Sequence, residues 1–227
     1  MSLPIDVAPV RVLIVDDESL IRSGFRFVLG VDPQIEIVAE ASDGAAAIEL
    51  VRRHRPDVVL MDVRMPVMSG PDATAVIVAE TSSKVVAMTS MDAEGQLMRM
   101  LFAGASGYLL KDEAPSRILE AVHRAAAGDA VFSARSTAQL VRRAVEGEGG
   151  VGRRNAVDRM SVLTDREREV AVLVASGATN QEIGTRLHIA SGTVKTHLEQ
   201  IYAKLFVRNR VQVGVIVERA GLGPSEL

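Results

Sequence analysis

The chain has 227 residues, enough for two modest domains, and its 48% hydrophobic and 24% charged composition is that of an ordinary globular protein. It contains no cysteine, which excludes disulfides, cysteine-ligated zinc and a thiol nucleophile, and fits a reducing compartment. No leader-like segment opens the chain and no apolar run approaches the roughly 18 residues of a membrane span. We therefore expect a cytoplasmic protein with no membrane anchor.

The net charge of −3 is unevenly distributed along the chain. Residues 1–128 hold 12 basic and 18 acidic side chains, whereas residues 129–227 hold 14 basic and 11 acidic ones. The second half is therefore the better partner for a polyanion such as nucleic acid. An excess of three positive charges is common on solvated surfaces, so motifs must decide whether the partner is nucleic acid.

The first half of the sequence alternates short apolar runs with segments of helical periodicity. The predicted strand and helix pairs are Arg11–Val15 with Ser19–Leu29, Ile35–Ala39 with Gly44–Arg53, Val58–Met61 with Pro71–Glu80, Val85–Met88 with Ala93–Ala103, and Tyr108–Leu110 with Pro115–Ala127. Five such units predict an α/β domain, a doubly wound five-stranded parallel sheet with helices on both faces.

The pattern changes after residue 130. Ala134–Val145 could form a short amphipathic helix, and the glycine-rich, charged segment Glu146–Arg159 is typical of an inter-domain linker. Beyond it only helices are expected, and Thr164 with Glu167 has the spacing of a capping box. We predict a first domain at 8–130, a linker with a short helix at 131–160, and a small all-α domain of four helices at 161–222.

Polar residues follow the predicted strands of the first domain: Asp16 and Asp17, Asp62, Thr89, and Lys111. The carboxyl ends of parallel strands meet at one edge of the sheet, so these side chains should converge there. Gathered carboxylates repel one another, and Mg²⁺ is a natural counter-ion because it accepts few protein carboxylates and retains water and phosphate oxygens. In this arrangement Asp62 could accept a phosphoryl group, with Lys111 pairing with one of its oxygens.

Four segments in this order, VLIVDDE, VVLMDVRMPVMSG, VVAMTS and GYLLKD, resemble the receiver domain of two-component response regulators, which has a flavodoxin-like fold. The resemblance implies that Asp62 is the phosphoacceptor and that Mg²⁺ is bound by Asp16, Asp17, Asp62 and the backbone carbonyl of Arg64. It also implies that Thr89 follows the phosphoryl group, that Tyr108 is an aromatic switch which turns inward, and that Lys111 contacts phosphate. Taken singly, each of these residues could be an ordinary strand-end or surface group.

The segments LTDREREV, GATNQEIGTRL and TVKTHLEQIYAKL resemble the LuxR-type helix-turn-helix of NarL/FixJ-class regulators. A third helix in the major groove would bring Lys195, Thr196 and Glu199 to base edges. The residues better suited to phosphate contact are Thr193, His197, Arg208, Asn209 and Arg210. Ala190 replaces the serine that usually caps this helix, and Phe206 replaces the usual glycine at its end.

These resemblances together imply a transcriptional regulator that takes a phosphoryl group from a sensor histidine kinase and binds promoter DNA as a homodimer. A phosphohydrolase with an aspartate nucleophile is a poorer interpretation, because such enzymes use an acid where this chain has Arg64. Two alternatives stay open: a regulator that works without phosphorylation, and a second domain whose apolar helical positions serve only protein contacts.

Overall fold

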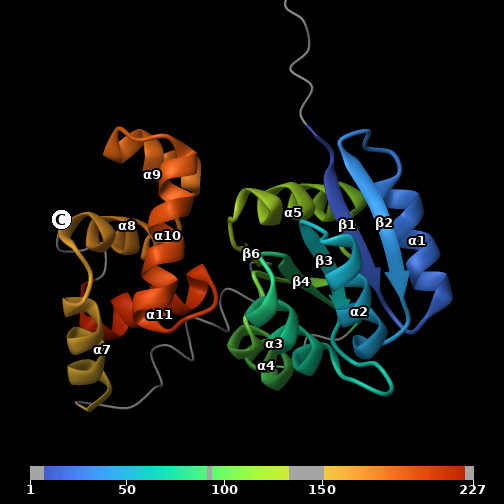
Figure 1. Cartoon of the computed structure of the whole chain (residues 1–227), viewed down its shortest axis with the longest axis horizontal. Helices are drawn as coiled ribbons and strands as arrows, with labels where there is room; N and C mark the ends of the chain where they lie inside the picture. Colours follow the sequence, from blue (N-terminus) through green and yellow to red (C-terminus); the bar gives the residue numbers. More distant parts are fainter. Residues whose placement is uncertain (1–7, 91–93, 133–150, 223–227) are drawn as a thin grey trace, which may run out of the picture.

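The computed structural model describes residues 8–90, 94–132 and 151–222, which form an α/β domain and a helical domain lying beside it (Figure 1). The strands of the first domain are β1 (Val10–Val15), β2 (Ile35–Ala41), β3 (Val58–Asp62), β4 (Lys84–Thr89), β5 (Gly107–Leu110) and β6 (Val131–Phe132). They are parallel and ordered β2-β1-β3-β4-β5-β6. The order reverses between β1 and β3, so the topological switch point lies between these two strands.

Helices cover both faces of the sheet. They are α1 (Ser19–Leu29), α2 (Gly44–His54), α3 (Gly70–Glu80), α4 (Glu94–Ala103) and α5 (Pro115–Ala127). Alternate strand residues point to opposite faces: Leu13 and Met61 join the core under α2, α3 and α4, whereas Ile14 and Leu60 join the core under α1 and α5. The doubly wound arrangement predicted from the sequence is confirmed.

The sheet has six strands where five were predicted. Helix α5 is followed by its C-cap Gly128, whose left-handed backbone (φ 87°) turns the chain back, and Val131–Phe132 then pairs with the start of β5. A strand of two residues is too short to show a period of two in the sequence. The extra strand matters because the turn before it, Gly128–Ala130, meets the helical domain.

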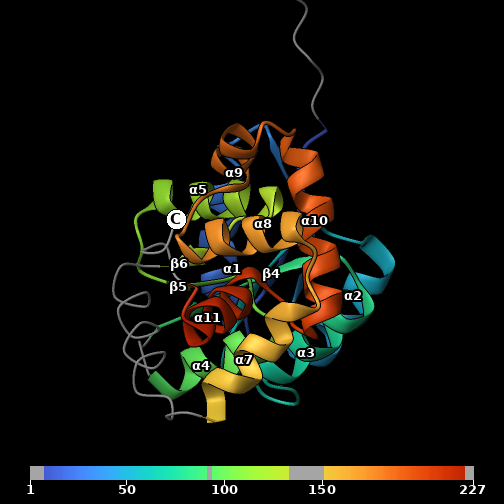
Figure 2. The same ribbon diagram turned by 90° about the vertical axis from the view of Figure 1, so that its left-hand side faces the viewer.

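The helical domain contains α7 (Val151–Ser161), α8 (Asp165–Ala175), α9 (Asn180–Leu187), α10 (Ser191–Leu205) and α11 (Arg210–Ala220). Figure 2, in which this domain faces the viewer, shows α11 between α8 and α7. Treating residues up to 160 as linker was therefore wrong for the segment from Val151 onward, since Ala156 and Met160 are buried in the core of this domain. The helix predicted over Ala134–Val145 lies outside the described residues.

The helix ends follow the sequence signals closely. Thr164 and Glu167 form the predicted capping box at the start of α8. Ala190 is the N-cap of α10 and makes no side-chain hydrogen bond there, and Phe206 adopts a left-handed conformation (φ 51°) at its end. This left-handed position favours glycine. The Phe206 side chain is 92% exposed, so burial of its ring does not offset the cost of that backbone conformation.

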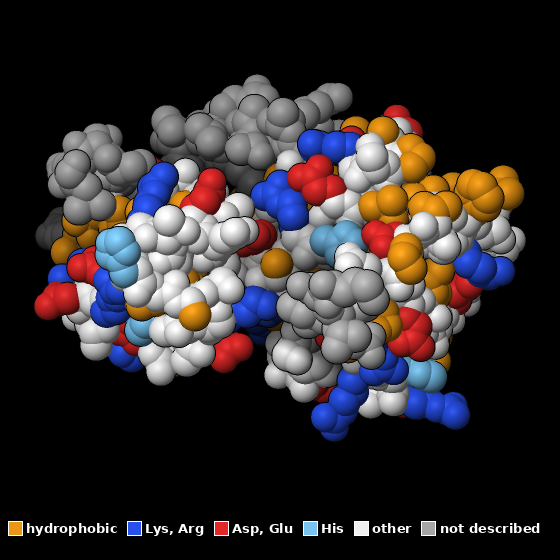
Figure 3. All heavy atoms as spheres, turned by 90° about the horizontal axis from the view of Figure 1, so that it is seen from above, with side chains coloured by type: hydrophobic (Ala, Val, Ile, Leu, Met, Phe, Trp, Pro, Cys, Tyr) orange, Lys and Arg blue, Asp and Glu red, His pale blue; other side chains and the backbone are white. Residues whose placement is uncertain are grey.

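One group of large apolar side chains is exposed on the first domain. Leu20, Phe27 and Val31, on α1 and just after it, are 80%, 77% and 63% exposed. Helix α1 lies at the end of the molecule farthest from the helical domain, at the right in Figure 1. Hydrophobic side chains gather at the same end in Figure 3. Within the described residues, none of the helices is both long and apolar enough to cross a bilayer.

Replacing Glu167 with alanine should destabilise the helical domain by about 2 kcal/mol, because its buried carboxylate accepts hydrogen bonds from the Thr164 amide and from Lys204 Nζ at 2.8 and 2.7 Å. Burial by itself raises the pKa of Glu167, but these bonds outweigh it and lower the pKa below its ordinary value of 4.5. The stabilisation is therefore present above about pH 4.5 and is lost as the pH falls below it. Urea unfolding followed by circular dichroism at pH 7 and pH 4 measures both effects.

Glu182 provides the matched control, since it occupies the same capping-box position in α9 but is exposed and has no lysine partner like Lys204. Glu182→Ala should therefore cost less than Glu167→Ala at pH 7. Equal losses for the two variants would show that the buried ion pair adds nothing to the cap.

Candidate functional site

Three carboxylates meet at the switch point between β1 and β3. Asp16 and Asp17 directly follow β1, and Asp62 is the last residue of β3. Oxygens of the three side chains lie within 4.8 Å of one another, and Asp16 and Asp62 are only 1% and 6% exposed. The structure thus brings together the acidic residues that the sequence placed at this edge.

Lys111, one residue beyond β5, lies between two of these acids. Its Nζ is 2.6 Å from Asp16 Oδ2 and 3.2 Å from Asp62 Oδ2, and its side chain is 7% exposed. Asp62 Oδ1 also accepts a hydrogen bond of 2.8 Å from the Val63 amide. One lysine therefore balances only part of the negative charge of the three carboxylates.

The charge imbalance is reflected in the pKa directions of Asp62 and Lys111. Burial raises the pKa of Asp62, with the nearby Asp16 carboxylate adding to the rise and Lys111 opposing it. Burial tends to lower the pKa of Lys111, but its hydrogen bond to Asp16 and the charge of Asp62 outweigh this, so its pKa is raised. Lys111 therefore stays protonated, and a further cation would favour the ionised form of Asp62.

The donor set fits a magnesium ion. Carboxylate oxygens from Asp16, Asp17 and Asp62 are hard ligands, and Asp17 is exposed, which leaves room for the water that Mg²⁺ retains. Arg64 lies two residues after β3, where the chain bends away from the sheet, and its backbone carbonyl remains a predicted ligand.

Thr89 and Tyr108 complete the edge. Thr89 ends β4, is 2% exposed and follows Met88, the strand neighbour of Asp62. Tyr108 on β5 is 1% exposed and packs in the core that lies under α2, α3 and α4. The sequence interpretation had Tyr108 turning inward on activation, but its ring is already inside in this structure. The role of Tyr108 as a switch therefore stays a prediction, with the inward position of the ring as its observed state.

The loop from β3 to α3 closes tightly beneath Asp62. The Gly70 amide donates to the Val63 carbonyl at 3.1 Å, and a Cβ atom added at Gly70 would lie 2.1 Å from the backbone oxygen of Asp62. Only glycine permits this approach, and the close contact fixes the direction in which the chain leaves Asp62.

The predicted DNA-contacting residues lie on α10 and around the start of α11. Thr193, Lys195, Thr196 and Glu199 are exposed on α10, and His197 is partly buried. Helices α9 and α10 have the order and connection of a helix-turn-helix, with α10 in the place of the recognition helix.

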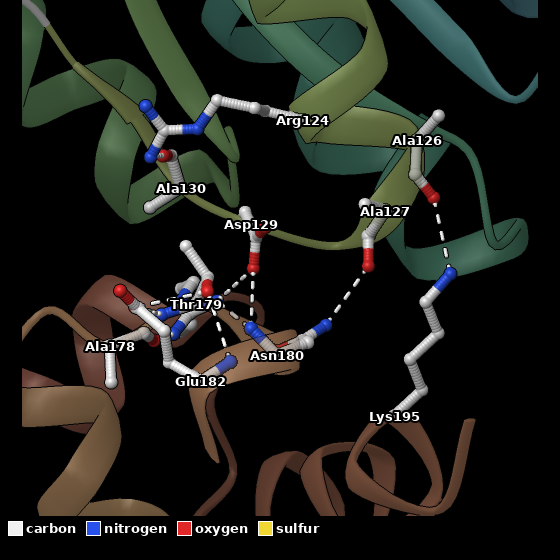
Figure 4. Close-up of polar contacts among 11 residues, drawn as sticks. Arg124, Ala126, Ala127, Asp129, Ala130, Ala178, Thr179, Asn180, Glu182 and Lys195 are labelled. Atoms are coloured by element: carbon white, nitrogen blue, oxygen red, sulfur yellow. Dashed lines mark hydrogen bonds and ion pairs between the residues drawn. The ribbon is translucent and has the colours of Figure 1, made fainter. Parts of the chain in front are cut away.

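Several of these residues contact the first domain, and Figure 4 shows the contact that Lys195 makes with Ala126. Lys195 Nζ donates to the Ala126 carbonyl at 3.4 Å. The remaining contacts link Arg208 to the Ala103 carbonyl, Asn209 to the Leu101 and Ala105 carbonyls, and Arg210 to Asp129. Charges on α10 also act on Lys84 of β4. Burial lowers the pKa of Lys84, and Lys195 adds to the decrease while the Glu199 carboxylate partly opposes it. The helix-turn-helix therefore faces the first domain with the surface that was predicted to face DNA.

All these contacts lie near the amino-terminal ends of the strands, whereas Asp62 lies at the carboxyl-terminal ends. Residues 101–105 comprise the end of α4 and the start of the turn to β5, and residues 126–130 comprise the end of α5 and the turn to β6, so both segments precede strands. Asp62, Thr89 and Lys111 lie at the other edge, at or just after the ends of strands. The two functional regions of the molecule are thus separated by the length of the sheet.

Sequence reasoning missed Asp129 and Asn180. Asp129 is 8% exposed and Asn180 is 3% exposed, and the Asn180 amide donates to Asp129 Oδ1 at 3.0 Å. Asn180 lies within the segment GATNQEIGTRL, but Asp129 belongs to no motif, and nothing in the sequence pairs the two residues.

Comparison with known proteins agrees with this geometry. Residues 12–123 match the family described as "Response regulator receiver domain", and residues 161–217 match "Bacterial regulatory proteins, luxR family". The nitrate/nitrite response regulator protein NarP of Escherichia coli is 39% identical over 212 residues, covering 93% of this chain and 95% of NarP. Transcriptional regulatory protein LiaR of Bacillus subtilis is 37% identical over 212 residues, covering 92% and 97%.

Solved structures show the same likeness. The response regulator ChrA of a heme-sensing two-component system is 30% identical, with a TM-score of 0.53 over 95% of this chain and 100% of ChrA. The receiver domain of the putative response regulator NarL from Mycobacterium tuberculosis is 38% identical, with a TM-score of 0.53 over 54% of this chain and 99% of that domain.

This chain belongs to the NarL/FixJ class of two-component response regulators, with a receiver domain followed by a LuxR-type helix-turn-helix domain. It is a DNA-binding transcriptional regulator and not an enzyme in the usual sense.

Proposed function

We propose that this regulator accepts a phosphoryl group on Asp62 from a sensor histidine kinase, and that phosphorylation releases its helix-turn-helix to bind promoter DNA as a homodimer. The observation that carries the proposal is the double use of one surface. Lys195, Arg208, Asn209 and Arg210, which are suited to DNA, are all engaged by the receiver. Asn209 and Arg210 are buried in the docked arrangement, so DNA cannot reach these two groups until the domains separate.

The chemistry needs a nucleophilic carboxylate and compensation of charge. An oxygen of Asp62 forms a bond to phosphorus as the P–N bond to the kinase imidazole breaks, and the bonding pair stays on the imidazole nitrogen, which takes up a proton. Lys111 is placed to pair with a phosphoryl oxygen, since its Nζ is 3.2 Å from Asp62 Oδ2. A magnesium ion held by Asp16, Asp17, Asp62 and the Arg64 carbonyl would offset the charge of the incoming group.

The proposal requires communication along the sheet, and α4 is the element suited to provide it. Helix α4 (Glu94–Ala103) follows β4, which ends at Thr89 beside Asp62, and finishes where Asn209 and Gln212 donate to the Leu101 carbonyl, both within 3.0 Å. Ten residues of helix span about 15 Å. Movement of Thr89 toward a phosphoryl group would shift this helix and weaken the contacts at its far end.

The experiment is a comparison of DNA binding with and without phosphorylation. A binding sequence is first selected from genomic fragments with the full chain, and its affinity is then measured by fluorescence anisotropy before and after treatment with phosphoramidate and Mg²⁺. We expect phosphorylation to tighten binding by about 5- to 150-fold, the usual range of coupling between two sites. Amide hydrogen exchange at Leu101–Ala105 and Asn209–Gln212 should accelerate in parallel.

Asp62→Ala is the control and should show neither effect. If phosphorylated wild type keeps both its DNA affinity and its exchange rates, coupling through docked domains is refuted. If Asp62→Ala binds DNA and drives transcription as phosphorylated wild type does, the regulator works without phosphorylation.

A further inference from the structure

We propose that the Asn180 amide and the Arg210 guanidinium form a binding site for a backbone phosphate of DNA, and that Asp129 of the receiver occupies this site in place of the phosphate when the domains are docked. The inference rests on the proposed DNA-binding function and adds to it a specific anion site together with the group that competes for it.

The contacts at Asp129 are those of a bound anion. Its Oδ1 accepts from the Asn180 backbone amide at 3.0 Å and from Arg210 Nη1 at 2.8 Å. Asn180 is the first residue of α9 and Arg210 the first residue of α11. A free amide at a helix N-terminus together with a guanidinium is the combination that proteins use for phosphate oxygens. The carboxylate comes from the other domain and lies on the loop between α5 and β6.

Both donors are held in place by their own domain. Arg210 is 7% exposed and also donates to the Ala178 carbonyl and, at 3.3 Å, to Asn180 Oδ1. The capping box of Thr179 and Glu182 fixes the first turn of α9. The site therefore does not depend on the receiver for its shape, and it should persist when the domains separate.

Separation would leave the Arg210 charge without the carboxylate that balances it. Separation also removes the receiver residues that help to cover Arg210, so its guanidinium would become accessible as a positive charge that attracts a new anion. Solvent and ions can reach the Asp129–Arg210 pair through a cleft of about 320 Å³ beside it. Both domains line this cleft, with Phe132 from the receiver and Val174 and Val211 from the helical domain.

The site lies on the surface that would meet DNA. Lys195 of α10 reaches the receiver at Ala126, and the Asn180 side chain reaches it at the adjacent Ala127 (Figure 4). In helix-turn-helix proteins the first helix crosses the DNA backbone while the second enters the major groove. The N-terminus of α9 is thus placed for a phosphate when α10 lies in the groove.

The first test is Asp129→Asn in the full, unphosphorylated chain. The asparagine keeps the size of the side chain but removes the charge that competes with phosphate, so DNA affinity should rise by about 5- to 50-fold, within the range of inter-site coupling. Glu36→Gln is the matched control, because this exposed receiver acid lies on β2, at the far edge of the sheet. It should leave DNA affinity unchanged.

The second test separates a phosphate site from a simple latch between domains. If Arg210 binds phosphate, adding Arg210→Gln to Asp129→Asn should reverse the gain and reduce the slope of log K against log salt by about 1. A latch predicts the opposite: Arg210→Gln alone would raise affinity as Asp129→Asn does, and the slope in the double variant would stay unchanged.

Arg210 also supports its own domain, so folding is checked by circular dichroism and a second readout avoids the residue. In full-length Asp129→Asn, the ¹⁵N amide signal of Asn180 should shift when the selected DNA is added. No shift, or no gain in affinity for Asp129→Asn while phosphorylated wild type binds DNA, overturns the phosphate site and leaves the proposed function standing. Failure of every form to bind DNA overturns both.

Discussion

Replacing Asp62 with asparagine should abolish phosphoryl incorporation, reducing it to the background of the assay. The amide keeps the shape of the side chain and can still accept the Val63 amide hydrogen bond of 2.8 Å, but it is not a nucleophile toward phosphorus. It also removes one of the three carboxylates that gather at the switch point. The measurement is transfer of labelled phosphoryl group from a phosphorylated histidine kinase or from labelled phosphoramidate in the presence of Mg²⁺.

Asp57→Asn is the matched control for this prediction. Asp57 precedes the same strand at its opposite end and accepts a hydrogen bond from the Arg11 amide at 2.8 Å, far from the carboxylate cluster. Incorporation should be unchanged in this variant. Undiminished labelling of Asp62→Asn would place the phosphoryl group on another residue and refute the site.

Replacing Gly70 with alanine should destabilise the receiver by about 3 kcal/mol, the upper end of the usual cost of overpacking. The new methyl group would lie 2.1 Å from the Asp62 backbone oxygen and 3.0 Å from Val63 Cα. These are backbone atoms and cannot rotate away, so the loop or the end of β3 must move. We expect a lower midpoint of urea unfolding together with slower phosphorylation, because the displaced segment carries Asp62.

Gly24→Ala is the control for this change. Gly24 lies within α1, and a Cβ atom added there meets nothing within 4 Å. Alanine is favoured over glycine inside a helix, so this variant should be more stable than wild type by up to about 1 kcal/mol. Stability of Gly70→Ala equal to that of wild type would show that the β3–α3 loop is not held as tightly as the structure indicates.

Most of the fold followed from local patterns. Apolar runs such as Val58–Met61 become buried strands because a central parallel strand is covered on both faces, and the helices between them show the 3.6-residue period of one buried side. What the patterns missed was short or depended on distant partners. Strand β6 has two residues, and α7 draws its stability from Ala156 and Met160 packed in the second core.

The receiver site was equally open to prediction, since Asp16, Asp62, Thr89 and Lys111 all lie at the ends of successive parallel strands. Topology alone brings such residues to one edge. The resting position of the Tyr108 ring was not predictable in this way, because it depends on how the side chain packs between β5 and its covering helices.

The sequence by itself therefore determined the two domains, the acidic edge around Asp62 and the helix-turn-helix. Only the tertiary structure showed that the DNA-facing surface is docked on the receiver and that Asp129 lies between Asn180 and Arg210. The physical reason is the identity of the acceptors. Apart from Asp129, the acceptors that the described part of the receiver offers are backbone carbonyls, those of Leu101, Ala103, Ala105, Ala126 and Ala127. Every residue carries a carbonyl, so no pattern of side chains records which ones a second domain will use.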